Sequence, residues 1–249
     1  MCILLINVFF FLNLTIIIAT ITLIERKILA LIQRRVGPNY IGYKGRLQFI
    51  ADALKLLSKQ IQILNFLNKN LFILIPCLIL IICYLFWINI IWGPNLNFFE
   101  IEYNILLMNI ISIFFSICLF LVGNITKNKY AKLSSYRVII TTINLEIFLN
   151  FIMIILIFFT ESFSFYKFFF LQKKFNIFIF ILLPILPEII LVFLLETGRI
   201  PFDLNEAESE LIAGYTTEFG GFFFALFYLG EYFHLYCFSL IYCILFFGN

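Results

Sequence analysis

Long apolar runs alternate with short polar segments along the chain, and this alternation predicts its main elements. Six runs are apolar and long enough to cross a bilayer, which takes about 20 residues per helix. They cover residues 3–24, 71–92, 105–123, 138–160, 175–195 and 219–247. Because no internal repeat or flexible linker divides them, we expect an all-α polytopic membrane protein with about six transmembrane helices. It should form a single domain over residues 1–249.

The polar segment after the first run contains a further predicted helix over residues 46–64. Polar side chains occupy one of its faces. Apolar side chains recur every three or four positions on the other face, at Leu47, Ile50, Leu54, Leu57, Ile61 and Leu64. A helix with this pattern lies in the plane of the membrane interface. It serves either as a surface anchor or as one wall of a functional chamber, and the pattern alone leaves both open.

The distribution of Lys and Arg predicts how the chain is oriented. Loops 25–70, 124–137 and 196–218 hold nine, four and one of these residues, which is 14 of the 17 in the chain. Because the spans alternate in direction, these three loops lie on the same side of the membrane. Cation-rich loops face the cytosol or the matrix. We therefore expect them on that side and the N-terminus on the opposite side.

The composition narrows the classes of function. Charged residues make up 12% of the chain, about half of the roughly 25% typical of soluble proteins. A net charge of +3 without a basic cluster argues against nucleic acid as a partner. The single histidine, His234, is too few for a bis-histidine haem or a three-histidine zinc site. We interpret the cysteines as small buried hydrophobic residues: Cys2, Cys77, Cys83, Cys118, Cys237 and Cys243.

Residues 196–218 hold an unusual concentration of acids between two apolar runs. They contain a single cation, Arg199, and six of the fourteen acids, namely Glu196, Asp203, Glu206, Glu208, Glu210 and Glu218. Carboxylates beside a bilayer are expensive to desolvate. Their concentration here indicates that protons, ions or a polar ligand pass nearby. The alternative is a solvated acidic connector.

Three further acids lie inside predicted spans. Glu146 lies in the fourth span, Glu188 in the fifth and Glu231 in the sixth. Acids within a membrane usually face a bundle interior or a water-filled cavity and mark proton or ion paths. We favour this interpretation over a structural carboxylate for Glu146 and Glu231. Glu188 follows Pro184 and Pro187, which should kink or open that helix, and for Glu188 both interpretations stay open.

Two stretches together resemble one known family. Residues 25–60 read ERKILALIQRRVGPNYIGYKGRLQFIADALKLLSKQ, and residues 196–232 read ETGRIPFDLNEAESELIAGYTTEFGGFFFALFYLGEY. Both resemble the membrane subunits at the quinone chamber of respiratory complex I, typified by the first subunit of mitochondrial NADH dehydrogenase. With the pattern of spans, the resemblance extends over essentially the whole chain.

The resemblance implies a core membrane subunit of proton-pumping NADH:ubiquinone oxidoreductase in the mitochondrial inner membrane, with the N-terminus toward the intermembrane space. Such a subunit forms the access chamber for ubiquinone, its substrate, and begins an acidic path that couples quinone reduction to proton translocation. It has no complete active site and binds no cofactor or metal. NADH, FMN and iron–sulfur clusters belong to partner subunits. The implied partners are hydrophilic subunits around the terminal iron–sulfur cluster, neighbouring membrane-arm subunits and lipid.

The resemblance also assigns residues to roles, none of them catalytic. The quinone chamber would include Arg26, Arg35, Asp52, Lys55, Arg199, Asp203, Phe223 and Phe227. A row of phenylalanines is more often plain packing. The proton path would include Glu146, Glu196, Glu206, Glu208, Glu210, Glu218 and Glu231.

The sequence departs from the family pattern in four respects. Thr141 and Leu145 lie near Glu146 where members often have Gln and Tyr. Glu188 is an acid where apolar residues are usual. Gln60 stands where members usually have Glu. Members usually continue for two more spans with an arginine-bearing loop, whereas this sequence ends at Asn249. We therefore expect a separate polypeptide to supply the missing helices.

Two alternative functions stay open on the sequence. One is the membrane subunit of a related hydrogenase-type complex that works without quinone, which the eukaryote-like composition and the quinone-type first loop disfavour. The other is an autonomous proton or cation carrier, which would use the acidic path without redox partners. The absence of internal repeats disfavours a carrier, since carriers often contain two related halves.

Overall fold

The fold is described by a computed structural model for residues 2–61, 67–90, 102–175, 183–184, 186–198, 202 and 214–246. All regular elements in these ranges are helical. The α-helices are α1 (Cys2–Ile32), α2 (Gln48–Ser58), α3 (Lys69–Asn89), α4 (Asn104–Thr126), α5 (Lys129–Thr160), α6 (Phe165–Phe175), α8 (Leu186–Glu196) and α10 (Gly221–Phe246). Two short 3-10 helices are η1 (Tyr43–Gly45) and η2 (Gly214–Thr216).

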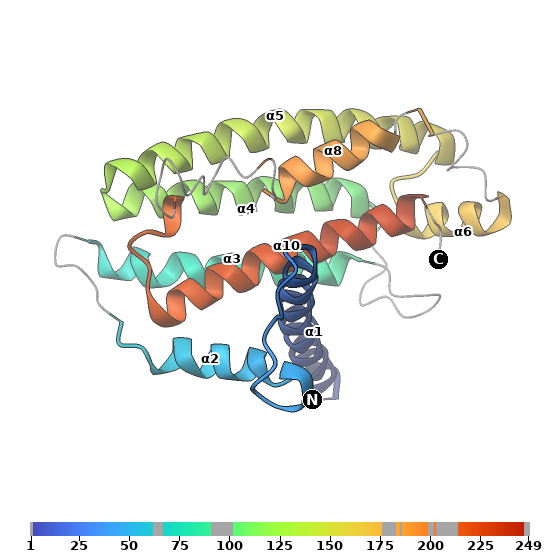
Figure 1. The fold of residues 1–249 in the computed structure, drawn as a ribbon. Helices are drawn as coiled ribbons and strands as arrows, with labels where there is room; N and C mark the ends of the chain where they lie inside the picture. Colours follow the sequence, from blue (N-terminus) through green and yellow to red (C-terminus); the bar gives the residue numbers. More distant parts are fainter. Residues whose placement is uncertain are drawn as a thin grey trace.

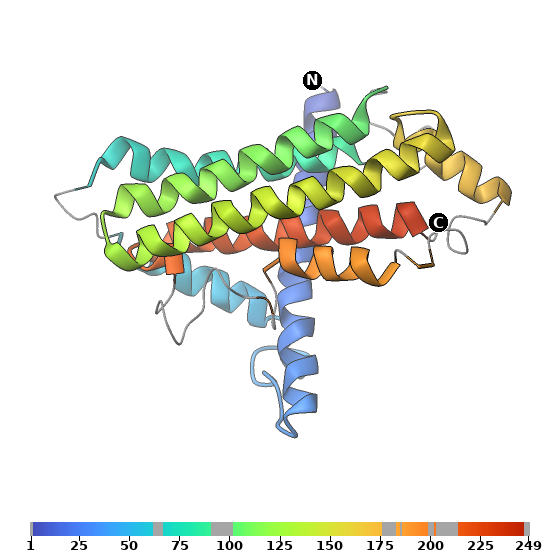
Figure 2. The same ribbon diagram turned by 90° about the horizontal axis from the view of Figure 1, so that it is seen from above.

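Four long helices form the body of the molecule. Helix α4 packs against both α3 and α5, and α10 packs against α3. Figures 1 and 2 show these four helices running lengthwise through the molecule. Each is long and apolar enough to cross a membrane, by length and composition. The expectation of an all-α polytopic membrane protein is therefore confirmed.

Within the described residues, four helices meet the criteria of length and composition, compared with about six spans predicted from the sequence. Helix α1 covers the first predicted span but crosses the bundle at a steep angle (Figure 2). In the fifth predicted span, α8 forms only the last part, and residues 176–182 lie outside the described residues. Pro187 lies in the first turn of α8, where the missing N–H of proline is tolerated.

Helix α1 is longer than the apolar run that predicted it. The run ends at Ile24, but the helix continues to Ile32 because the charged residues that follow are good helix formers. Beyond the helix, Arg34 has a φ of 54° and Pro38 follows, so the chain turns away. This extension places Glu25 and Arg26 on a rigid helical surface.

The predicted amphipathic helix is present as α2, but it is shorter than the predicted range of residues 46–64. It ends at Ser58, because Lys59 is extended, and residues 62–66 lie outside the described residues. No side chain of α2 is buried. Leu54 and Leu57 on its apolar face are about 60% exposed, at 60% and 59%. The apolar face therefore points away from the chain, as a helix at a membrane interface or a partner surface would require.

The corner between α4 and α5 is tight. Lys127, with a φ of 54°, ends α4, and Asn128 begins α5 directly afterwards. A Cβ atom placed on Gly123 would lie 2.4 Å from the Ser135 side chain and 2.5 Å from the carbonyl oxygen of Ala131. The two helices therefore approach each other closely at this end.

Aromatic packing fixes the position of α10. The Phe219 ring, just before α10, stacks on Phe72 of α3 with centroids 4.2 Å apart. Further along α10, the buried His234 ring stacks on Phe115 of α4 at 4.5 Å. These contacts hold α10 against α3 and α4 along much of its length.

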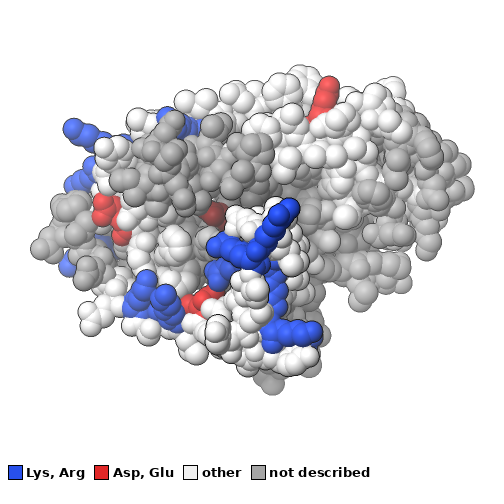
Figure 3. All heavy atoms as spheres, in the orientation of Figure 1, with Lys and Arg blue, Asp and Glu red and all other residues white. Residues whose placement is uncertain are grey.

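Cations concentrate toward one end of the molecule. Figure 3 shows Lys and Arg near α2, near the first turns of α5 and around the end of α1. The described part of the opposite end shows almost none on this face. The first turns of α3, α5 and α10 all lie at the cation-rich end (Figure 1). Which compartment this end faces stays a prediction.

Candidate functional site

The site begins where α1 and α2 meet. The Arg26 guanidinium of α1 forms an ion pair with the Asp52 carboxylate of α2 at 2.5 Å. The Gln48 amide donates to the other Asp52 oxygen at 3.1 Å. Both partners of the ion pair are accessible to solvent, so the pair contributes little to stability. Its effect is to orient the polar face of α2 toward α1.

A second contact joins α1 to α10. The Tyr232 hydroxyl donates to the Glu25 carboxylate at 2.6 Å, and the Tyr228 hydroxyl lies 3.3 Å from that of Tyr232. Sequence reasoning did not include Glu25 among the site residues. Its position beside Arg26 in the ERK motif was the available signal, but a charge at the end of an apolar run is usually interpreted as a span boundary.

Glu231 joins α10 to η2. It lies next to Tyr232 in sequence and accepts a hydrogen bond from the Tyr215 hydroxyl of η2. Tyr215 is buried, and η2 packs against α5 and α4. The proton-path candidate Glu231 is thereby placed close to the interface between α10 and the α4–α5 pair.

Glu146 and Glu196 form a second group of acids. Glu146 of α5 is buried next to the Ser112 hydroxyl of α4, and Glu196 ends α8, which packs against α5. One oxygen of each carboxylate is buried without a hydrogen-bond partner among the described residues. Glu196 lies outside the four long spanning helices. Its burial first, and the Glu146 charge second, raise the pKa of Glu196 to about 8.

Glu218 is held at the cation-rich end of the bundle. Its carboxylate accepts a hydrogen bond from the Asn128 amide nitrogen at 3.0 Å. Asn128 is the residue that caps α5, so this bond ties the segment before α10 to the α4–α5 corner. Sequence reasoning did not identify Asn128.

Arg35 and Lys55 occupy exposed positions. Arg35 shares with Arg26 a cavity of about 260 Å³ between the end of α1 and the Gly37-Pro38 turn. No carboxylate among the described residues pairs with the Arg35 guanidinium. Lys55 lies on α2 and is exposed. The structure thus brings Arg26, Arg35 and Asp52 together and leaves Lys55 apart from them.

Phe223 and Phe227 lie in the packed interior of the chain. Phe223 contacts Phe72 edge to face at 5.5 Å, and Phe227 contacts Phe219 in the same manner at 4.8 Å. Only 6% and 1% of their surfaces, respectively, are exposed. This favours packing over direct contact with a ligand for both rings.

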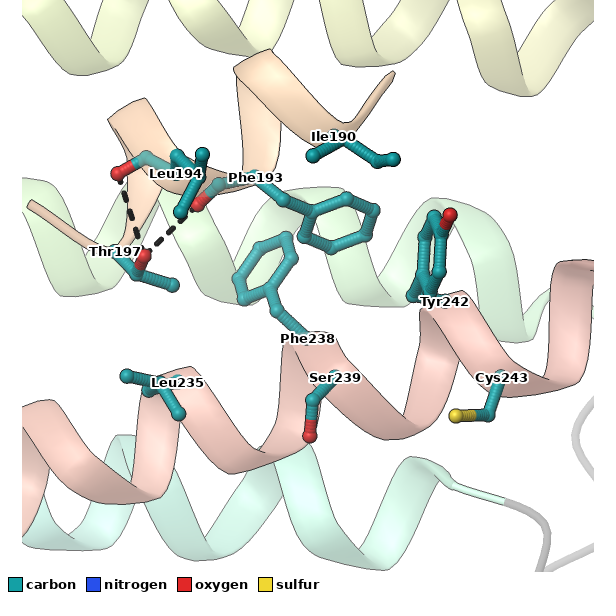
Figure 4. A pocket seen from close by; sticks show the side chains of 9 residues that line it. All are labelled: Ile190, Phe193, Leu194, Thr197, Leu235, Phe238, Ser239, Tyr242 and Cys243. Carbon is teal, nitrogen blue, oxygen red and sulfur yellow. Dashed lines mark hydrogen bonds between the residues drawn. The ribbon is translucent and has the colours of Figure 1, made fainter. Parts of the chain in front are cut away.

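An apolar cavity of about 360 Å³ lies between α8 and α10 (Figure 4). Phe193 of α8 and Phe238 of α10 contact each other edge to face at 5.4 Å on its wall. The Thr197 hydroxyl donates back to the Phe193 carbonyl oxygen at 2.9 Å. The polar atom at this edge is therefore satisfied within the chain, and the cavity suits hydrocarbon.

Several predicted site residues lie outside the described residues. They are Arg199, Asp203, Glu206, Glu208 and Glu210. The described acids on either side of that segment, Glu196 and Glu218, are positioned by α8 and by Asn128.

The arrangement suits proton exchange. Carboxylates paired with hydroxyl and amide donors accept and release protons, and they respond to any charge that appears nearby. Within the described residues, no group of three or more His, Cys, Asp or Glu side chains is placed to hold a metal ion. The five described cysteines are free thiols.

Comparisons with known proteins agree with this description. The family model of NADH dehydrogenase matches residues 5–249. A Paramecium tetraurelia protein named NADH-ubiquinone oxidoreductase chain 1 is 54% identical, over 94% of this chain and 90% of its own length. Proteins of the same name from Apis mellifera ligustica and Neurospora crassa are 39% and 38% identical over 93% of this chain. The aligned part covers 74% of the Apis protein and 62% of the Neurospora protein.

Proposed function

Because the chain belongs to the NADH dehydrogenase family, we propose that it is the membrane subunit of NADH:ubiquinone oxidoreductase that shapes the quinone-access chamber. It also begins the acidic path that couples quinone reduction to proton translocation. The observation that carries this proposal is the set of polar contacts joining α1, α2 and α10. These contacts link residues of the two stretches that resemble the family.

The chamber would lie beside α1, α2 and the first half of α10. Arg26 and Arg35 share a cavity there, and Asp52 orients Arg26. A cation near a polar head group stabilises negative charge that develops on reduction. Lys55, Arg199 and Asp203 belong to the same proposal, while Phe223 and Phe227 support the wall from behind.

The proton path would begin with the carboxylates next to the chamber, starting with Glu231. Reduction of a quinone consumes protons and shifts charge, and a carboxylate in a low-dielectric region responds strongly to such a shift. Glu231 contacts η2 through Tyr215, and η2 packs against α5, which carries Glu146. Glu196 lies beside Glu146. The path would also use Glu206, Glu208, Glu210 and Glu218.

The same proposal defines partners and location. The subunit would lie in the mitochondrial inner membrane with its cation-rich end in the matrix. Hydrophilic subunits would hold FMN and the iron–sulfur clusters, and other membrane-arm subunits would continue the path. The separate polypeptide with additional helices stays a prediction. The hydrogenase-type and carrier alternatives are not favoured, because the relatives share one name and function class.

Native electrophoresis of gently solubilised membranes tests the proposal. We expect this chain to co-migrate with iron–sulfur subunits in a very large band that oxidises NADH within the gel, as identified by mass spectrometry. Migration as a small independent oligomer, away from NADH oxidation activity, would contradict the proposal. Ion flux by the isolated chain in liposomes would then favour the carrier.

A further inference from the structure

Asn128 occupies the corner between α4 and α5 and makes two hydrogen bonds in different directions. Its side-chain oxygen accepts from the Tyr130 backbone N–H at 3.2 Å, which caps α5. Its side-chain nitrogen donates to the Glu218 carboxylate at 3.0 Å. The first bond leaves the amide nitrogen directed toward Glu218, because the oxygen and nitrogen of one amide diverge from the same carbon atom.

The corner that carries Asn128 is rigid. Lys127 stops α4 in a left-handed conformation, and α5 starts one residue after Asn128. The close approach at Gly123 holds the two helices together below the corner, and Ala131 is fully buried. The position of the amide is therefore set by the bundle and not by a flexible loop.

Contacts at both ends hold the segment that carries Glu218. Tyr215 binds Glu231 at one end of this segment, and Phe219 is fixed between Phe72 and Phe227 at the other. These contacts fix the backbone. The amide of Asn128 fixes the direction of the Glu218 side chain.

We infer that Asn128 is a positioning residue for Glu218 in the acidic path. This inference rests on the proposed function of the chain. An amide is well suited to the role, because it offers an acceptor for the helix cap and a donor for the carboxylate at the same time. Asp and Ser can both cap a helix, but Asp lacks the donor and Ser lacks the reach.

Variants that keep the cap and alter only the second bond test this role. In the assembled complex, Asn128→Ser removes the donor to Glu218. Losing one hydrogen bond to a charged group corresponds to about a tenfold effect. We therefore expect quinone reductase activity about five- to tenfold lower, with NADH oxidation by an artificial acceptor unchanged. Asn128→Asp should lower it further, because two carboxylates would then face each other.

A reciprocal exchange tests whether the hydrogen bond between the two side chains accounts for the loss of activity. In the double variant Asn128→Asp/Glu218→Gln, the amide and the carboxylate trade places, and the hydrogen bond between them is restored. We expect its activity to exceed that of Asn128→Asp and that of Glu218→Gln. Asn70→Asp is the matched control, since it adds the same charge to an exposed position in the first turn of α3. This variant should leave quinone reductase activity unchanged.

The outcomes separate this inference from the proposed function. Wild-type activity in both Asn128 single variants, or a double variant no better than Asn128→Asp, would overturn the positioning role. A silent Glu218→Gln would overturn it as well, because there would be nothing to position. If the assembled complex that contains the wild-type chain fails to reduce quinone, the proposed function itself fails.

Discussion

Individual carboxylates of the candidate site are held by different kinds of donor. Glu25 and Glu231 accept from tyrosine hydroxyls, Asp52 pairs with a guanidinium, and Glu218 accepts from an amide. Glu196 differs, because one of its oxygens is buried without a partner among the described residues. Variation in the donor lets similar acids respond differently to the same change in charge.

Glu196 should make the number of protons translocated per NADH depend on pH. With its pKa raised to about 8, the group holds a proton at neutral pH and loses it as the pH rises through that value. We expect proton translocation per NADH to change with a midpoint near pH 8, and we expect Glu196→Gln, which cannot titrate, to lack this change. Acidification of membrane vesicles measured across a pH series provides the test. Glu188→Gln, on the exposed side of the same helix, is the control and should keep the transition. An identical transition in Glu196→Gln would assign it to another group.

Arg26 should affect the use of quinone more than the stability of the chain. Replacing it by Ala leaves Asp52 without its cation and removes a positive charge from the cavity shared with Arg35. We expect the apparent KM for quinone to rise about tenfold, as the loss of a charge-assisted contact implies. Steady-state kinetics with a short-chain quinone measure this. Lys167→Ala, which removes an exposed cation on α6, should leave the KM unchanged. An unaltered KM in Arg26→Ala would remove this residue from the chamber.

The sequence predicted these residues to different degrees. Arg26, Asp52 and Glu231 stood out by motif or by their position in an apolar run, and the structure places them at helix–helix contacts. Glu25 and Asn128 did not stand out, because their partners lie 207 and 90 positions away along the chain. Such pairings follow from how the helices pack, and no local pattern in one sequence encodes them.

At the scale of helices, small residues determine how closely neighbours approach. Gly123 allows α4 to contact α5, and Gly230 faces Ile79 of α3, where an added Cβ atom would lie 2.7 Å from a side-chain carbon. Small residues at such crossings are typical of helix packing in membranes. Gly123 therefore sets the distance between α4 and α5, which carries Glu146. Gly230 sets the distance between α3 and α10, which carries Glu231.

A methyl group at Gly123 should loosen the corner that carries Asn128. Gly123→Ala forces α4 and α5 apart, because the nearby carbonyl oxygen of Ala131 belongs to the backbone and cannot rotate away. Overpacking of this kind costs about 1–3 kcal/mol. We expect less assembled complex and a lower temperature of inactivation, measured by activity after brief heating. Gly220→Ala is the control, since a Cβ atom there meets nothing within 4 Å. Equal stability of both variants would show that the corner can adjust.

Helix positions were predicted well and helix limits less well. Apolar runs located α3, α4, α5 and α10, because burial in a bilayer requires continuous hydrophobicity. Helix α5 begins at Lys129, before the predicted span, since polar residues extend a helix beyond the membrane without interrupting it. The steep crossing of α1 was not predictable, because hydropathy carries no information on the angle between helices.

At the scale of the whole molecule, charge distinguishes the two ends of the bundle. Cations cluster near α2 and the start of α5, and the described part of the other end is nearly bare on the face shown in Figure 3. An asymmetry of this kind usually fixes the orientation during insertion. The chain thus carries its own topological signal.

Labelling from either side of the membrane should reveal this orientation. We expect a cysteine introduced by Lys129→Cys to react with a membrane-impermeant maleimide only from the matrix side. A cysteine introduced by Lys167→Cys should react only from the intermembrane side. Both positions are exposed and lie near opposite ends of α5. The unaltered chain reports the background from Cys77 and Cys243, which are also exposed. The reverse pattern would invert the proposed topology.

Two of the hydrogen bonds between α10 and its neighbours have a geometric consequence for the rotation of that helix. Glu231 and Tyr232 are consecutive, so their side chains leave the helix about 100° apart, one toward η2 and the other toward α1. A rotation of α10 about its long axis moves both side chains around the same circle. Because both side chains are already within hydrogen-bond distance of their partners, a rotation in either direction carries both away from them. Together the two bonds therefore fix the rotation of α10 about its axis, in addition to the aromatic packing that holds it against α3 and α4.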